Sequence, residues 1–141
     1  MLASLAAALL YGRAFEPWLR KSDFALRESS ASPVGMAFAN AAAAQIGKTV
    51  FYDSTYVPLS YPGGDVPVRI GVCADVVIRA LRTEGIDLQK EVHEDMQTAF
   101  NDYPHYWDLA KPDSSIDHRR VPNLMRYFQR HGKALPTAKE D

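Results

Sequence analysis

The single cysteine of the chain, Cys73, has the chemistry of a nucleophile and stands in the segment RIGVCADVVIRAL, residues 69–81. The thiolate is the reactive form of cysteine, and a free thiol is mostly protonated at neutral pH. If a helix begins at Cys73, its unpaired N–H groups and the positive end of its dipole favour the thiolate. The alternative is a small apolar residue packed at the start of a helix, which the spacing alone favours.

Three neighbours of Cys73 act on this chemistry in different ways. Asp75 places a negative charge close to the thiol and disfavours the thiolate, and Arg69 offsets that charge if it folds back. Gly71 permits close approach of the backbone. The amide of Cys73 or of a neighbour is therefore a candidate donor of an oxyanion hole.

A cysteine nucleophile needs a general base within hydrogen-bond reach. His118 stands beside Asp117 in the polar segment SIDHRR and is the candidate base within the chain. The alternative is that Asp117 caps the following helix and that residues 118–120 form a solvated or substrate-facing patch. His93 is expected to be a structural hydrogen-bonding residue.

Four further side chains are candidates for substrate binding. Arg119 and Arg120 can grip a carboxylate or a phosphate, although a solvent-facing pair before a helix is an equal alternative. Tyr61 and Asp65 are the first and last residues of the turn YPGGD. Aromatic side chains in such a loop either line a groove or cover the core.

Acidic residues suggest a second chemistry, the hydrolysis of sugars by paired carboxyl groups across an apolar cleft. Solvated helix faces are the better explanation of these acids, which are Glu94, Asp95, Asp102 and Asp108. With one cysteine and four histidines, none of them three or four residues apart, the sequence does not support a metal site. No cofactor is expected.

The composition is that of one globular domain, with 141 residues of which 47% are hydrophobic and 23% charged. The net charge of −1 provides no basic field for nucleic acid. The first residues, MLASLAAALLYG, have about the length of the core of an export signal and are too short to span a bilayer. An export signal predicts a periplasmic or exported protein. The alternatives are an amphipathic helix, which leaves the protein cytoplasmic, and a membrane-surface anchor.

Apolar periodicity predicts helices over residues 34–46, 73–84, 88–100 and 122–130, and a short strand near 50–52. Each of the last three helices has one predicted apolar face, formed in turn by Cys73, Val76, Val77, Ala80 and Leu81, by Leu88, Val92, Met96, Ala99 and Phe100, and by Val121, Leu124, Met125 and Phe128. No further sheet is evident that would cover these faces. We therefore expect partial exposure of the helices over 73–84 and 88–100, which would permit self-association.

Two long strings, YPGGDVPVRIGVCADVVIRALRTEGIDLQKEVHEDM and DSSIDHRRVPNLMRYFQRHG, resemble a bacterial family called domain of unknown function 1287 (DUF1287, YijF-like). The resemblance covers about residues 37–132. That family in turn resembles the NlpC/P60 papain-like superfamily, whose members cut amide bonds in cell-wall peptides. This implies an α+β papain-like fold in the complete domain, with a cysteine at the start of a helix that packs on a sheet. It also implies Cys73 as the nucleophile and a histidine from a later strand as the base.

The same resemblance implies a strand-rich half beyond the segment RHG, which would supply the sheet and the base. The chain is then the N-terminal portion of the domain, mostly helical with little strand. Residues 1–31 are assigned to a signal-like segment and linker, 32–132 to the helical portion, and 133–141 to a polar tail. The chain is predicted to be the N-terminal part of a papain-like cysteine hydrolase that acts on amide bonds, with a peptidoglycan peptide as candidate substrate. The alternative is a catalytically incomplete helical fragment or binding module.

Overall fold

The computed structural model describes residues 32–133, so the predicted signal-like segment, its linker and most of the polar tail lie outside the described residues. The chain divides into two units, Met1–Met36 and Ala37–Asp141. The described part of the first unit is the beginning of α3, where the Ser32 hydroxyl accepts the N–H of Gly35 at 3.1 Å. The sections below concern the second unit.

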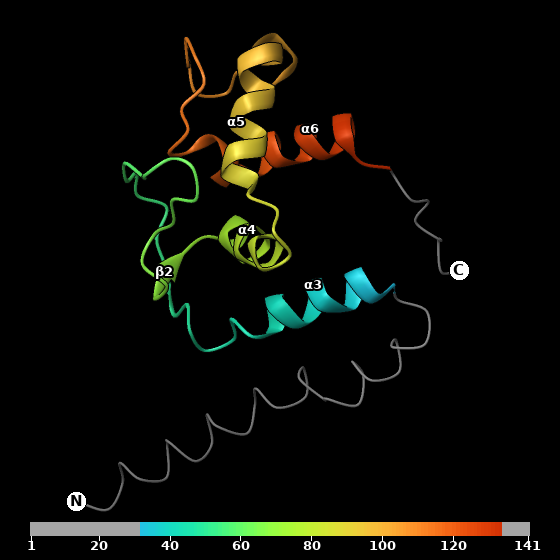
Figure 1. The fold of residues 1–141 in the computed structure, drawn as a ribbon. Coiled ribbons are helices and arrows are strands. Elements are labelled where there is room, and N and C mark those ends of the chain that lie inside the picture. The colour runs from blue at the N-terminus through green and yellow to red at the C-terminus, as the bar shows by residue number, and fades with distance from the viewer. Residues whose placement is uncertain (1–31, 134–141) are drawn as a thin grey trace, which may run out of the picture. The chain divides into compact units, whose positions relative to one another are not determined.

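Helices dominate the described residues, and all four predicted helices are present (Figure 1). No helix among residues 32–133 is long and apolar enough to cross a membrane. The elements in chain order are α3 (Pro33–Ala43), β1 (Phe51–Tyr52), β2 (Ile70–Gly71), α4 (Cys73–Thr83), α5 (Leu88–Ala99), η2 (Phe100–Asp102), η3 (Asp117–Arg119) and α6 (Val121–His131).

Local signals explain where these helices begin and end. Asp87 caps α5 by accepting the N–H of Gln89 at 3.1 Å, and Pro122 occupies the first turn of α6, where its missing N–H costs nothing. Gly85 follows α4 with a φ of 81°, a left-handed conformation that stops the helix. Helix boundaries of this kind are readable from the sequence, and they were predicted to within a few residues.

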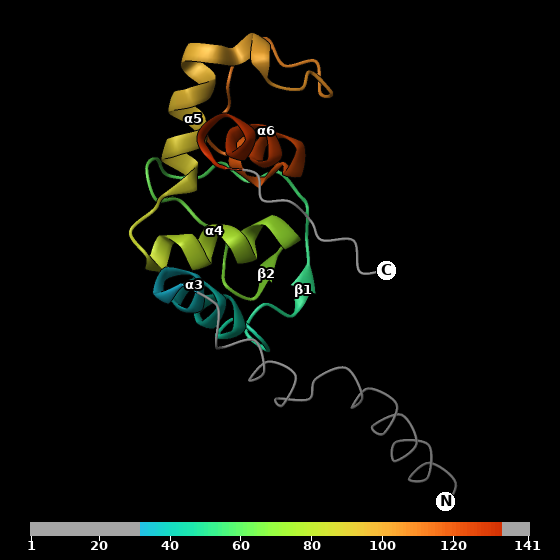
Figure 2. The same cartoon turned by 90° about the vertical axis from the view of Figure 1, so that its right-hand side faces the viewer.

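The two strands, both labelled in Figure 2, form a small parallel pair in which Phe51 pairs with Ile70 and Tyr52 with Gly71. The strand at residues 50–52 was predicted, but β2 was not. Its two residues are too few to show a strand pattern, and its pairing depends on a segment distant in the sequence. In the chain, β2 is separated from Cys73, the first residue of α4, by one residue.

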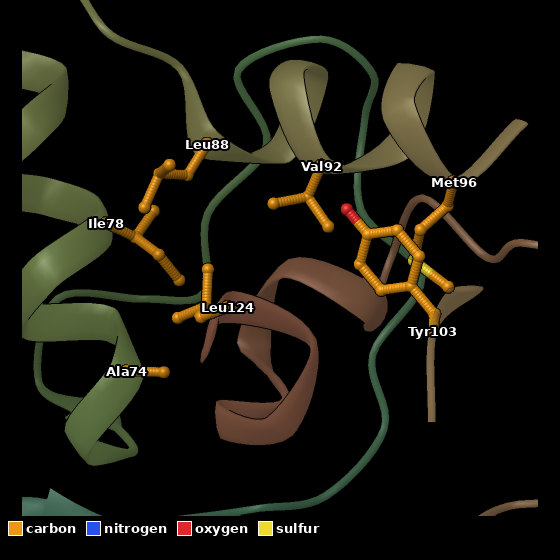
Figure 3. Close-up of a cluster of buried hydrophobic side chains, with 7 residues drawn as sticks. All are labelled: Ala74, Ile78, Leu88, Val92, Met96, Tyr103 and Leu124. Atoms are coloured by element: carbon orange, nitrogen blue, oxygen red, sulfur yellow. The ribbon is translucent and has the colours of Figure 1, made fainter. Parts of the chain in front are cut away.

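The core lies where α4, α5 and α6 meet, and Figure 3 shows their apolar side chains pointing into one cluster. Burying each of the large members stabilises the fold by about 2 kcal/mol. The cluster consists of Ala74, Ile78, Leu88, Val92, Met96, Tyr103 and Leu124.

The predicted apolar face of α4 is wrong in its first turn. Cys73 is exposed, and Val76 is 36% exposed. The buried face instead includes Ala74, Asp75 and Ile78. The helix is turned in this way because Asp75 is held inside by an ion pair, which no apolar pattern reveals.

The other two predicted faces have mixed outcomes. On α5, Leu88, Val92 and Met96 are fully buried, so the expected exposure of this face is wrong for these three residues, whereas Ala99 and Phe100 are half-buried. On α6, Leu124 is buried but the rest of the predicted stripe is exposed, and Asn123 is buried instead, with its Nδ2 donating to the carbonyl of Asp117 at 3.1 Å. The exposed members of that stripe are Val121, Met125 and Phe128.

A buried amide, Gln89, fixes the long loop that precedes α4. Its Oε1 accepts the N–H of Gly64 at 2.8 Å, and its Nε2 donates to the carbonyls of Ser60 and Ser114 at 2.9 and 3.1 Å. Gly64 is required here, because a Cβ at this position would lie 2.2 Å from the Ser60 oxygen. The turn YPGGD is thereby tied to both α5 and the segment before η3.

Replacing Gln89 by alanine is expected to reduce the free energy of unfolding by about 3 kcal/mol, because the buried N–H of Gly64 and two partly buried carbonyl groups lose their partner. Urea unfolding followed by circular dichroism measures this loss. Gln97→Ala on the exposed face of the same helix is the control, with an expected change within about 0.5 kcal/mol. An equal loss in both variants would contradict the role given to Gln89.

Candidate functional site

Cys73 is the first residue of α4 and follows β2 by one residue, Val72. Val72 has an extended backbone and provides no side-chain cap, so the first N–H groups of this 11-residue helix are not all consumed by capping. The thiol is exposed at this helix end. The predicted position of Cys73 at a helix N-terminus is therefore confirmed, and its interpretation as a packed apolar residue is not supported.

An open groove of about 410 Å³ runs beside the thiol, between the end of α3, β1 and the first turn of α4. Its walls are mostly apolar, and none of the described residues that line it is a histidine, an aspartate or a glutamate. The lining consists of Ala42, Gln45, Ile46, Gly47, Thr49, Val50, Phe51, Tyr52, Gly71, Val72, Cys73 and Val76. The described residues thus supply a thiol and an apolar wall in this groove, without a general base among them.

Beneath the first turn of α4, Asp75 and Arg119 form a buried ion pair. Nε of Arg119 donates to Oδ1 of Asp75 at 2.9 Å, and Nη2 donates to Oδ2 at 3.0 Å. The backbone N–H of Val72 also donates to Oδ2, at 2.6 Å. Both side chains are only 3% exposed. The hydrogen bonds that Arg119 donates to Asp75 raise the pKa of Arg119 above its usual value, so the guanidinium stays charged.

Gly71 makes room for this carboxylate. A Cβ at Gly71 would lie 2.8 Å from Oδ2 of Asp75, which is closer than side-chain carbons come. The absence of a side chain at Gly71 thus accommodates the Asp75 carboxylate, and the expected oxyanion hole at this turn stays a prediction. Arg69 was expected to offset the Asp75 charge, but it lies over the ring of Phe51 at 5.8 Å, and Arg119 neutralises Asp75 instead.

His118 is buried, with 2% of its surface exposed, and it does not line the groove beside Cys73. Burial is the main cause that lowers its pKa to about 4, and the charge of Arg119 adds to the effect. The expected solvated patch at residues 118–120 is therefore wrong, since His118 and Arg119 are buried and Arg120 is half-buried. Among the described residues, no hydrogen bond joins His118 to Cys73.

Asp117 does not cap α6, contrary to expectation. Its carboxylate is buried, accepts the backbone N–H of Asp113 and pairs with Arg120 at 3.3 Å, so it closes its own loop. Burial raises the pKa of Asp117. The guanidinium of Arg120 also stacks on the ring of Trp107, 4.1 Å from its centre. Both arginines proposed to bind substrate thus have partners within the chain.

The other two predicted substrate-binding residues, Tyr61 and Asp65, lie at the turn before β2. The Tyr61 hydroxyl donates to Glu94 at 3.4 Å, and its ring meets His93 edge-on at 5.1 Å. Asp65 accepts two hydrogen bonds from Arg79, at 2.8 and 3.1 Å. Neither residue lines the groove beside Cys73.

Three of the acidic residues considered for sugar hydrolysis are bound by cations of the chain: Glu94 pairs with Lys90, and Asp95 and Asp102 share Arg130. Asp95 is bound by Arg130, Tyr103 and His131, with its Oδ2 2.8 Å from Arg130 Nε and 2.6 Å from the Tyr103 hydroxyl. Burial raises the pKa of Asp95, but these hydrogen bonds outweigh it and lower the pKa to about 2. No cluster of three metal-ligating side chains occurs among residues 32–133.

The chain matches one protein family over most of its length. A family described as "Domain of unknown function (DUF1287)" matches residues 39–141. The "Uncharacterized protein YijF" of Escherichia coli (strain K12) is 62% identical over 104 residues, which cover 74% of this chain and 51% of YijF. The chain therefore spans about half the length of this curated relative. No solved structure matches the chain.

Lowering the pH from about 6.5 to 4 is expected to destabilise the protein through His118. The unfolded chain protonates this histidine near its ordinary pKa of 6.5, whereas burial keeps it neutral in the folded state down to about pH 4. The unfolded state therefore binds more protons in this window, which lowers the free energy of unfolding by about 3 kcal/mol. Urea unfolding at several pH values measures this slope.

His118→Gln should flatten the decline between pH 6.5 and 4 relative to the wild type. The exposed His105 provides the control, because His105→Gln should leave the slope unchanged. Parallel pH curves for the wild type and His118→Gln would contradict the buried neutral state of this histidine.

Proposed function

The chain belongs to the DUF1287 family, and from that premise we propose that it carries the nucleophile of a papain-like cysteine hydrolase. One observation carries this proposal: the thiol of Cys73 is exposed at the first residue of α4, at the edge of an apolar groove. A thiol in this position receives the favourable field of the helix N-terminus and remains open to a substrate.

The reaction is acyl transfer. Sγ of Cys73 attacks the carbonyl carbon of an amide bond, and a general base takes the thiol proton and passes it to the leaving amine. Water then hydrolyses the thioester and restores the thiol. The oxyanion that forms at each step needs backbone N–H donors, and the first turn of α4 is the candidate source.

We assign the general base to a part of the full-length family protein that lies outside the described residues. His118 is buried and does not line the groove, and no described lining residue is a base. The chain spans about half of YijF, so the relative has ample further residues to supply a histidine and the sheet of an α+β papain-like fold.

The substrate class that fits the groove is an extended peptide with an apolar side chain next to the scissile amide. Phe51, Tyr52 and Val76 provide exposed apolar surface at this place. A peptide of the bacterial cell wall is the candidate substrate. Because this substrate lies outside the cytoplasm, the proposal includes export of the protein.

A second candidate function is peptide binding without catalysis. It is favoured by the absence of a base among the described lining residues of the groove. The two candidates differ in one outcome, which is whether a bound amide is cleaved.

A full-length chimera, in which this chain replaces the 104-residue matched region of YijF, tests the hydrolase. We expect it to release amines from cell-wall peptides, and Cys73→Ala should lower the rate by at least about 1,000-fold, because the acyl acceptor is lost. Amine release detected by mass spectrometry is the measurement.

Thr98→Ala, on the exposed side of α5, is the control and should retain the chimera's full rate. A chimera that binds the peptides equally well with and without the Cys73 thiol, and cleaves none, would reject the hydrolase in favour of the binding module.

A further inference from the structure

We propose that Arg119 is a positioning residue for Cys73, which neutralises the buried carboxylate of Asp75 and so keeps the thiol reactive. This inference rests on the proposed function, because it assigns to Arg119 a role toward the nucleophile. It follows from the geometry of the first turn of α4 and from the charges packed around it.

The carboxylate of Asp75 lies close to the thiol-bearing turn. Its Oδ2 accepts the N–H of Val72, the residue directly before Cys73, at 2.6 Å. Asp75 is two residues beyond Cys73 in the same turn and is buried. An unpaired anion in this position would repel a thiolate and would also oppose the favourable dipole of the helix.

Arg119 removes that penalty. Its two hydrogen bonds to Asp75 are side by side, at 2.9 and 3.0 Å, so the charges are held in a fixed planar geometry. With both side chains 3% exposed, water screens the pair little. The Asp75–Arg119 pair itself therefore carries no net charge.

The other titratable or charged groups near this turn, Asp53, Arg69 and His118, either contact other residues or are uncharged. Asp53, whose N–H donates to Gly71, uses its carboxylate to accept the N–H of Thr55 at 2.8 Å. Arg69 lies over Phe51, and burial keeps His118 neutral above about pH 4 by lowering its pKa. Among the described residues, Arg119 is the cation that forms an ion pair with Asp75.

The test is the rate at which iodoacetamide alkylates Cys73 in the full 141-residue chain between pH 6 and 10. Arg119→Met should slow alkylation at pH 7 by about tenfold and move the pH–rate profile to higher pH, because Asp75 is left unpaired. Arg119→Lys keeps the charge and should retain at least about a third of the wild-type rate. The double variant Asp75→Asn/Arg119→Met removes both charges and should restore the wild-type profile.

Arg79→Met is the matched control. Arg79 lies on α4, as Asp75 does, and donates two hydrogen bonds to the carboxylate of Asp65. It should change the alkylation rate by less than about twofold. If Arg119→Met does not fold, as judged by its thermal transition, Asp75→Asn provides the test. It leaves the guanidinium uncompensated and should raise the rate at pH 7 about tenfold.

Two results would overturn the inference: a double variant as slow as Arg119→Met, or an Arg79→Met variant slowed to the same extent. Alkylation needs neither a general base nor a substrate. An inactive chimera with the Arg119 effect intact would therefore reject only the proposed function. An active chimera whose Cys73 alkylation is insensitive to Arg119 would reject only this inference.

Discussion

The buried ion pair between Asp75 and Arg119 determines how the described part of this protein is arranged. It joins η3 to the first turn of α4 across 44 residues of sequence. Removing one partner from such a pair costs about 3–5 kcal/mol, because the other charge stays buried and unpaired. The pair also fixes the rotation of α4, since Asp75 must face inward. Cys73, two residues earlier, therefore faces outward.

The same constraint separates the two residues that the sequence suggested as a catalytic pair. The ion pair anchors Arg119 in the interior, and the neighbouring His118 is buried as well and does not line the groove. The thiol of Cys73 is exposed beside an apolar wall, whereas His118, the candidate base, is buried in the interior. This division supports the proposal that a nucleophile in this half is completed by a base from the rest of a DUF1287 protein.

Local features of the fold were predictable, and non-local ones were not. Periodicity located all four helices, and Asp87, Pro122 and Gly85 marked ends through chemistry that acts within a few residues. The first turn of the apolar face of α4 was assigned wrongly because Ala74 and Ile78 form a second apolar stripe beside the predicted one, whereas Ala80 is buried as predicted. Which stripe is buried depends on whether a cation pairs with Asp75. That cation, Arg119, is 44 residues away in the sequence.

The sequence by itself determined the family, the helices and the place of Cys73 at a helix start, because each of these depends on residue types at short spacing. The tertiary structure alone decided which side of α4 faces solvent, which arginine neutralises Asp75, and that His118 is buried. These are outcomes of long-range packing, in which a charge leaves water only where a partner compensates its desolvation. Cys73 is exposed because its neighbour Asp75 found such a partner.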